Sequence, residues 1–128
     1  MPITVGLKGR ADAQVSKETT AMAAGSGSLL VFGTPFMIAL MEKAACAAIE
    51  AQLEEGQSSV GTRLDVTHDS ATPVGMDVWA EAEVTAVEGR KLTYTVTAYD
   101  EKGVIGKGNH ERFLIRSESF LQKTYEKL

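Results

Sequence analysis

The sequence predicts an α+β fold in which one long apolar helix lies against an antiparallel sheet and a short helix ends the chain. Two observations carry this prediction. Residues 34 to about 53 are apolar on nearly every side, which is typical of a buried helix. The stretches after residue 60 alternate between apolar and polar side chains, which is typical of strands. At 128 residues the chain is expected to form one domain over residues 1–128 and to associate with further copies.

The start of the long helix is marked by Thr34 and Pro35. A threonine hydroxyl can accept a hydrogen bond from a free amide at a helix start, and proline fits the first helical position because no donor is needed there. We therefore expect Thr34 to cap the helix. Cys46, within the helix, is expected to fill the core, and as the single cysteine it cannot form an internal disulfide, which fits a reducing compartment.

The segments before the helix are less regular. Residues 3–15 predict an irregular first strand, residues 16–20 a turn, and residues 21–28 a weakly structured stretch of small residues. This last stretch is either a lid over Thr34 or a plain connecting loop.

Four strands and a terminal helix follow the long helix. Strands are predicted at residues 60–68, 76–86, 91–99 and 104–115. Alternation places Val60, Leu64 and His68 on the face toward the helix. The terminal helix is expected to be capped by Ser117 and to pack through Phe120, Leu121, Thr124 and Tyr125.

Charge and composition exclude several classes of function. The net charge is −4 and the pI is near 5.2, so a nucleic-acid partner or an anionic membrane surface is disfavoured. The N-terminus has no basic segment followed by an apolar run, so a cytoplasmic location without a signal peptide is expected. His68 and His110 are the only histidines and Cys46 has no companion cysteine, so neither a metal site nor a bound cofactor is expected.

Glu42 is the most informative residue of the helix. Its neighbours three and four positions away are apolar, and a carboxylate on such a face requires a partner. His68 is the other ionisable residue at an inward position, so the two are expected to meet as an acid/base pair. The alternatives are an internal ion pair or a subunit contact for Glu42, and a hydrogen-bonded core histidine for His68.

The helix start supplies a third component of a candidate site. Free amides and the positive end of the helix dipole favour developing negative charge there, at Gly33, Thr34 and Phe36. Thr34 and Glu42 are two turns apart and about 80° around the helix axis, so a substrate of modest length could reach both. Thr34 is alternatively a simple helix cap.

The blocks Val31–Met37, Glu42–Ala45, Val60–His68, Ala71–Met76 and His110–Phe113 resemble the hotdog-fold thioesterases, in the branch of the fluoroacetyl-CoA thioesterase. The resemblance covers residues 3–117 and implies a hotdog fold. It also implies catalytic roles for Thr34, Glu42 and His68. A backbone contact of Gly61 near the substrate carbonyl is implied as well.

The resemblance further implies a homodimer that binds an acyl-CoA near its subunit interface, with tetramer formation left open. The function expected is hydrolysis of a small acyl-CoA thioester. The alternatives are an acyl-CoA-binding or assembly module without catalysis and, more remotely, a dehydratase. The aromatic lid expected of the fluoroacetate enzyme has no counterpart in residues 22–28, so the acyl group is left open.

Overall fold

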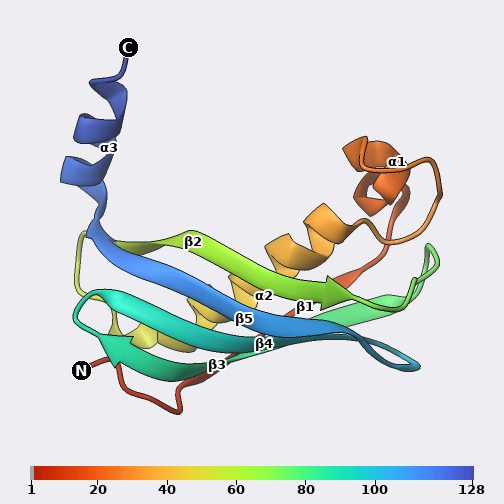
Figure 1. Ribbon diagram of the computed structural model, residues 1–128, viewed down its shortest axis with the longest axis horizontal. Helices are drawn as coiled ribbons and strands as arrows, with labels where there is room; N and C mark the ends of the chain where they lie inside the picture. Colours follow the sequence, from red (N-terminus) through yellow and green to blue (C-terminus); the bar gives the residue numbers. More distant parts are fainter. Residues whose placement is uncertain (1) are drawn as a thin grey trace.

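A five-stranded antiparallel sheet and one long helix form the body of the protein in the computed structural model, which describes residues 2–128 (Figure 1). The strands are β1 (Lys8–Gln14), β2 (Gln57–His68), β3 (Asp77–Glu88), β4 (Lys91–Asp100) and β5 (Gly103–Arg116). Their order across the sheet is β1-β3-β4-β5-β2, so β1 and β2 are the two edges. Strand β1 is therefore shorter than the predicted first strand, which covered residues 3–15.

Helix α2 (Thr34–Ile49) crosses one face of this sheet and continues into the short 3₁₀ turn η2 (Glu50–Gln52). The predicted helix is thus confirmed almost to its expected end, with a tighter last turn. The side of α2 that faces the sheet is fully buried, as Met37, Met41 and Ala44 illustrate. They pack against inward residues of β3 and β4 such as Ala80 and Leu92.

Gly9 allows α2 to approach β1 closely. A Cβ atom at this position would collide with the backbone of Ala44 and Ala48 in the C-terminal half of α2. Absence of a side chain here therefore sets how tightly the helix is held against the first strand.

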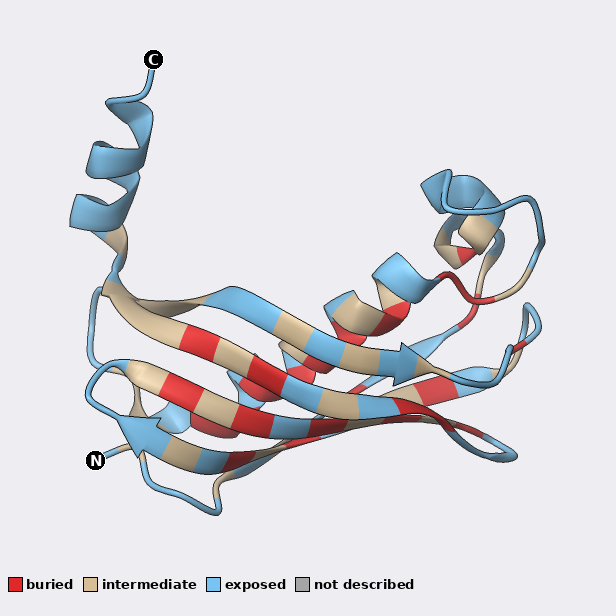
Figure 2. Cartoon of the chain, in the orientation of Figure 1, coloured by how far each residue is buried: buried red, intermediate tan, exposed pale blue. Residues whose placement is uncertain are grey.

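The opposite side of α2 is uncovered in the single chain. Pro35, Ala39, Lys43 and Cys46 are exposed. In Figure 2, pale blue exposed stretches of α2 alternate with red buried ones. The expectation that the helix is buried all round, with Cys46 as a core residue, is therefore wrong for one chain. The single sheet can cover only one side of a helix, and nothing else in the described chain reaches the other.

A β-bulge interrupts strand β2 between Gly61 and Arg63, where the pairing with β5 shifts by one residue. Because alternation is broken there, Leu64, Val66 and His68 keep the predicted inward placement but Val60 does not. Gly61 faces α2 instead, since a Cβ there would meet the Glu42 carboxylate. The predicted face of Val60 is therefore wrong.

The residues before α2 are more ordered than their composition predicts. They form a loop, residues 20–32, hereafter the α1 loop, which contains the one-turn helix α1 (Ala21–Ala24). Thr20 is fully buried and caps α1, accepting a hydrogen bond from the Ala23 amide at 3.1 Å. Backbone pairing of Thr20 with Phe32 closes the loop, and a second pairing joins Val31 to Pro73.

Helix α3 (Ser117–Tyr125) leaves the end of β5 and projects away from the sheet (Figure 1). Ser117 is its first residue and no side chain caps the helix, which corrects the expected cap. The apolar residues expected to pack are exposed, with Leu121 at 54% and Tyr125 at 65%. The described chain contains no surface that they could cover, because α3 extends beyond the sheet.

The close approach at Gly9 gives a stability prediction. Gly9→Ala should lower the free energy of unfolding by about 1–3 kcal/mol, because the new methyl group overlaps the backbone of α2. Urea unfolding followed by circular dichroism measures the change. Gly27→Ala is the matched control, because a Cβ there meets only the Ala21 Cβ at 3.5 Å. Equal effects of the two substitutions would contradict this account of the helix position.

Candidate active site

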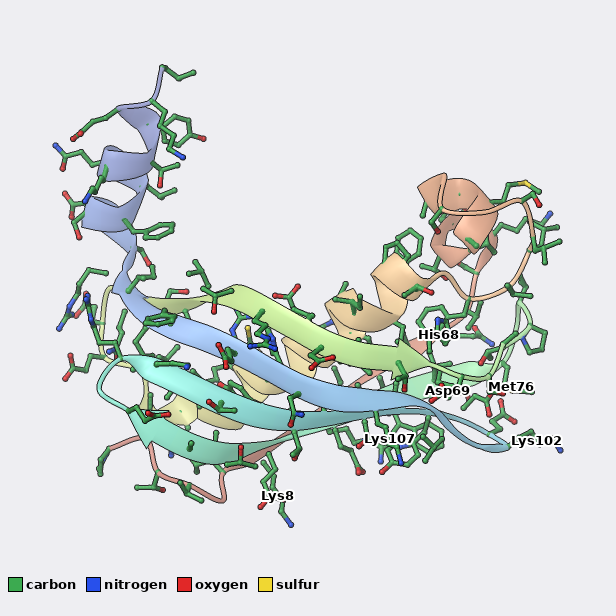
Figure 3. The ribbon with its side chains drawn as sticks, in the orientation of Figure 1. Lys8, His68, Asp69, Met76, Lys102 and Lys107 are labelled. Atoms are coloured by element: carbon green, nitrogen blue, oxygen red, sulfur yellow. The ribbon has the colours of Figure 1, made fainter. Side chains whose placement is uncertain are left out.

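Thr34 and His68 form a hydrogen-bonded pair at the start of α2. The Thr34 Oγ1 lies 2.7 Å from the His68 Nδ1. His68 is the last residue of β2, and Figure 3 shows its side chain beside the first turn of α2. Thr34 is the first helical residue and Gly33 occupies the capping position, so the expected cap is not formed and the hydroxyl is directed to His68 instead.

Burial lowers the pKa of His68 below its usual value of 6.5, and the nearby Asp69 carboxylate opposes this shift. Desolvation disfavours the charged imidazolium, so the neutral imidazole is the form present at neutral pH. When the Nδ1 atom of a neutral imidazole is unprotonated, it can accept the proton of the Thr34 hydroxyl. The geometry is that of a nucleophile with an adjacent general base.

Glu42 is not paired with His68 but with Arg112. The Arg112 Nη1 donates to the Glu42 Oε2 at 2.9 Å. The expected contact between Glu42 and His68 is therefore absent within one chain, and the ion pair considered as an alternative is present. The guanidinium is almost fully buried and the carboxylate is partly exposed, with side-chain exposures of 7% and 37%.

Arg112 is held in place by hydrogen bonds on every side. Its Nε donates to the Ser59 Oγ at 2.9 Å and its Nη2 to the Ser59 carbonyl at 3.0 Å. His110 lies behind it, with its Nε2 at 3.3 Å from the Arg112 Nη1 and its Nδ1 at 2.7 Å from the Arg63 carbonyl. His110 therefore donates from Nδ1 and accepts at Nε2, which is the arrangement of a neutral imidazole.

Burial also lowers the pKa of His110, a shift that the Arg63 carbonyl opposes and the Arg112 charge reinforces. The structure places His110 on the inward face of the sheet, where it is fully buried. His110 thus serves to orient Arg112.

Gly61 completes the group around Glu42. A side chain at Gly61 would collide with the Glu42 carboxylate and would approach the Arg112 Nη1 to 3.1 Å. Glycine at the bulge therefore leaves the carboxylate room beside the edge strand. The backbone contact of Gly61 with a substrate carbonyl, which the resemblance implies, stays a prediction.

The amides of Gly33 and Phe36 are occupied within the chain. Gly33 donates to the Thr19 carbonyl at 3.0 Å, and Phe36 donates to the Gly33 carbonyl at 3.0 Å. Neither is free to stabilise an oxyanion, contrary to the expectation from the helix start. The amide of Thr34 is the one that remains without an intrahelical acceptor, because it is the first helical residue and Pro35 has no N–H.

The site residues thus form two groups on one helix. Thr34 and His68 lie at its start, and Glu42, Gly61 and Arg112 lie near its middle. Eight residues of α-helix span about 12 Å, so one thioester carbon cannot contact both groups of the same chain.

Two cavities lie along α2. One of about 230 Å³ is lined by Thr34, His68 and the α1 loop. A larger one, of about 520 Å³, lies along the uncovered side of α2 and is lined by Lys43, Cys46 and Ser59.

Arg112 is the residue that sequence reasoning did not assign to the site. Arg112 is buried beneath the sheet, on the face toward α2. The sequence does contain a signal for Arg112. His110 and Arg112 are two residues apart on one strand, so they lie on the same face of the sheet, and either both or neither point toward Glu42 on the helix.

No group of three or more possible metal-ligating side chains occurs within residues 2–128. None of the helices described over those residues is long and apolar enough to cross a membrane.

Comparison with known proteins identifies the family. The pattern of the fluoroacetyl-CoA-specific thioesterase (FlK) family matches residues 15–118. The chain belongs to this family. It is 46% identical over 97 residues to the fluoroacetyl-CoA thioesterase of Streptantibioticus cattleyicolor, a match covering 76% of this chain and 70% of that protein.

Two solved structures confirm the fold of this FlK family member. A threonine-to-serine variant of the fluoroacetyl-CoA thioesterase in complex with acetyl-CoA has a TM-score of 0.92 and 38% identity, covering 98% of each chain. A hot-dog-like protein from Thermanaerovibrio acidaminovorans has a TM-score of 0.87 and 25% identity, covering 98% of this chain and 93% of that one. The predicted hotdog fold and the predicted class of thioesterase are therefore both confirmed.

The ion pair at the second group gives a further prediction. Arg112→Gln should lower the free energy of unfolding by about 2 kcal/mol, because it removes hydrogen bonds from Ser59 and Glu42 in a partly buried setting. In a Glu42→Gln background the same substitution should cost less, which a double-mutant cycle by urea unfolding at fixed protein concentration measures. Arg116→Gln is the control, because its contact with Glu54 is exposed. An Arg112 effect that is equal in both backgrounds would exclude coupling between the two residues.

Proposed function

We propose that this FlK family member hydrolyses the thioester of a small acyl-CoA as a homodimer, in which each active site combines Thr34 and His68 of one subunit with Glu42 of the other. The observation that carries the proposal is the contact between Thr34 and His68, because it pairs a nucleophile with a base. The relative in complex with acetyl-CoA supports the class of substrate.

Two uncovered surfaces support the homodimer. Strand β2 is a 12-residue edge strand whose outer side has no partner among the described residues, and such edges are templates for pairing with another chain. The uncovered side of α2 lies along the same edge and presents Ala39 and Cys46 to solvent. Antiparallel pairing of two β2 strands would extend the sheet and bring the uncovered sides of two α2 helices together.

The position of the two-fold axis follows from the two site groups. Bringing Thr34 of one helix opposite Glu42 of the other requires an axis near Ile38, halfway between them. On β2, the residues in contact with these groups are His68 and Gly61, so the same axis passes between Leu64 and Asp65. Helix and strand thus give one consistent two-fold axis. It places Gly61 of one subunit opposite the partner's His68.

The chemistry proceeds in two steps. The neutral His68 accepts the hydroxyl proton of Thr34, and the Thr34 Oγ attacks the thioester carbon to form an acyl-threonine ester. The carbon–sulfur bond breaks, and His68 returns the proton to the leaving thiolate of coenzyme A. Water then enters, and His68 takes its proton as the hydroxide attacks the ester carbon. The bond between this carbon and the Thr34 Oγ breaks, and His68 returns the proton to the Thr34 oxygen, which releases the free acid and restores the hydroxyl. The free amide of Thr34 is placed to donate to the oxyanion.

Glu42 acts from the opposite subunit in this arrangement. Its charge is balanced by Arg112, which makes it a weaker nucleophile than an unpaired carboxylate. We assign to it the orientation of the attacking water, with Arg112 fixing the direction of the carboxylate. Thr34 rather than Glu42 is therefore the proposed nucleophile.

The size of the cavity beside Thr34 favours a short acyl group. About 230 Å³ also has to hold part of the pantetheine thiol arm, so little room remains for a long chain. The decisive assay measures free thiol release from acetyl-, fluoroacetyl-, propionyl- and longer acyl-CoAs. Short chains should turn over fastest, and acyl-CoA that stays bound but intact would overturn hydrolysis in favour of a binding module.

Mixing two inactive variants tests the composite site. Glu42→Gln and His68→Ala should each lower kcat about 10²-fold or more. A mixed dimer contains one intact site, so unfolding and refolding the two variants together should restore about a quarter of the wild-type activity, since half of the dimers are mixed and each has one working site. Mixing Glu42→Gln with the Glu42→Gln/His68→Ala double variant is the control and should restore none. If the mixture of Glu42→Gln and His68→Ala is as inactive as the control mixture, the active site lies within one chain.

The pH dependence tests the role of His68. The neutral imidazole of His68 is the active form, and its pKa lies below the ordinary histidine value of 6.5. On acidification, kcat/KM should therefore fall only at pH values below 6.5. Asp69 raises the pKa of His68, so Asp69→Asn should move this acid limb to still lower pH. A pH series of initial rates for the two proteins measures the shift. Movement of the limb to higher pH would exclude neutral His68 as the base.

A further inference from the structure

Asp100 is a buried carboxylate that none of the proposed steps uses. It is the last residue of β4 and is 5% exposed. Its Oδ1 accepts from the Lys102 amide at 2.8 Å, and its Oδ2 accepts from the Thr72 hydroxyl at 2.7 Å. No salt bridge within residues 2–128 involves Asp100. A carboxylate buried without a cation depends on such hydrogen bonds.

The two hydrogen bonds of Asp100 have different reach. The bond to the Lys102 amide is local and closes the turn between β4 and β5, which is a common use of aspartate in turns. The bond to Thr72 joins residues 28 positions apart. It leaves the hairpin of β4 and β5 and reaches the chain that follows β2, so a role in the turn alone does not account for it.

Residues 69–72, hereafter the post-β2 segment, are held by this hairpin at both ends. At the start of the segment, the Asp69 amide donates to the Ile105 carbonyl of β5 at 2.7 Å. At its end, Thr72 is fully buried and donates to Asp100. Figure 1 shows the β4–β5 hairpin, the end of β2 and the α1 loop at the same end of the sheet.

Thr72 also joins the post-β2 segment to the start of α2. The Phe32 amide donates to the Thr72 carbonyl at 2.9 Å. Proline at position 73 disfavours helical backbone conformations of Thr72, which limits the directions in which this carbonyl can point. Phe32 lies two residues before Thr34, and Thr72 lies four residues after His68. One residue thus links the chain next to the nucleophile with the chain next to the base.

The cavity of about 230 Å³ beside Thr34 and His68 is lined by the same two stretches of chain. Apart from Ala21 and Ser26, its lining residues come from positions 31–34 and 68–71. Thr34 belongs to the first stretch and His68 to the second. The relative position of the two stretches therefore sets the distance between the Thr34 Oγ1 and the His68 Nδ1, which is 2.7 Å.

We propose that Asp100 is a positioning residue for the proposed hydrolysis, on which this inference rests, and that it acts through the Thr72 hydroxyl to hold Thr34 and His68 in contact. A carboxylate can only accept, so the Thr72 hydroxyl is fixed as the donor. A charged acceptor also makes this bond stronger than one between neutral groups. Asp100 and Thr72 are not among the residues that line the cavity, so neither is a catalytic residue.

Two substitutions of Thr72 test this role and leave the turn bond of Asp100 intact. Thr72→Val removes the hydroxyl at nearly constant shape and should lower kcat about 10-fold or more, with a smaller change in KM, because the nucleophile and its base lose their alignment. Thr72→Ser keeps the hydroxyl and should retain kcat close to that of the wild type. Thiol release from short acyl-CoAs measures both constants, on protein shown to be folded by circular dichroism.

A matched control and a double variant complete the kinetic test. Thr85→Val makes the same substitution at an exposed position of β3, where the hydroxyl bonds the Thr93 carbonyl, and should leave kcat unchanged. Asp100→Ala/Thr72→Val removes both partners and leaves no unpaired buried carboxylate, so it keeps the test valid if Thr72→Val alone does not fold. Its kcat should be as low as that of Thr72→Val, because both act through one bond.

Hydrogen exchange gives a readout that does not depend on activity. In Thr72→Val the Phe32 amide should exchange several-fold faster than in the wild type, because its acceptor is no longer held by Asp100. The Val84 amide, which donates to the Leu7 carbonyl at 2.9 Å, should keep its rate. Equal acceleration of both amides would mean a general loss of stability and would overturn the positioning role.

The outcomes distinguish this inference from the proposed function. If the wild type hydrolyses acyl-CoA and the folded Thr72→Val or double variant does so with wild-type kcat, the positioning role of Asp100 is overturned and the proposed function stands. If the wild type hydrolyses none of the acyl-CoAs, the proposed function is overturned together with the role of Asp100 in it.

Discussion

The rigidity of helix α2 is the constraint on which the site depends. Thr34 and Glu42 are fixed about 12 Å apart by the rise of an α-helix, and the close approach at Gly9 holds that helix against β1. Neither side chain can move far enough to meet the other. A site that uses both therefore requires a second helix running in the opposite direction, and the uncovered side of α2 is the surface that such a helix would cover.

The Glu42 carboxylate at the centre of α2 forms an ion pair with the buried guanidinium of Arg112. Arg112 directs its donors at Glu42 and at Ser59, and His110 keeps the guanidinium in position by accepting from it while donating to the Arg63 carbonyl. Such a network tolerates a carboxylate on an apolar helix face because both charges are hydrogen-bonded.

Strand β2 contacts both groups of site residues and the start of α3. Its bulge turns Gly61 toward Glu42, its last residue holds Thr34, and its first residues lie beside the origin of α3. The α1 loop and α3 both extend past this edge, where a single chain offers them no surface to cover. The uncovered helix side and the unpaired strand are the two surfaces that the proposed second subunit would cover.

The sequence by itself determined the α+β fold, the start of α2 and the inward direction of His68, because helix and strand periodicities are local properties of the chain. It also singled out Glu42, since a carboxylate among apolar neighbours is visible without a structure. Only the tertiary structure decided its partner, because Arg112 is 70 residues away and meets it through the pairing of β2 with β5. The exposure of Cys46, the reversed face of Val60 and the ordered α1 loop were likewise decided by contacts that local patterns do not encode.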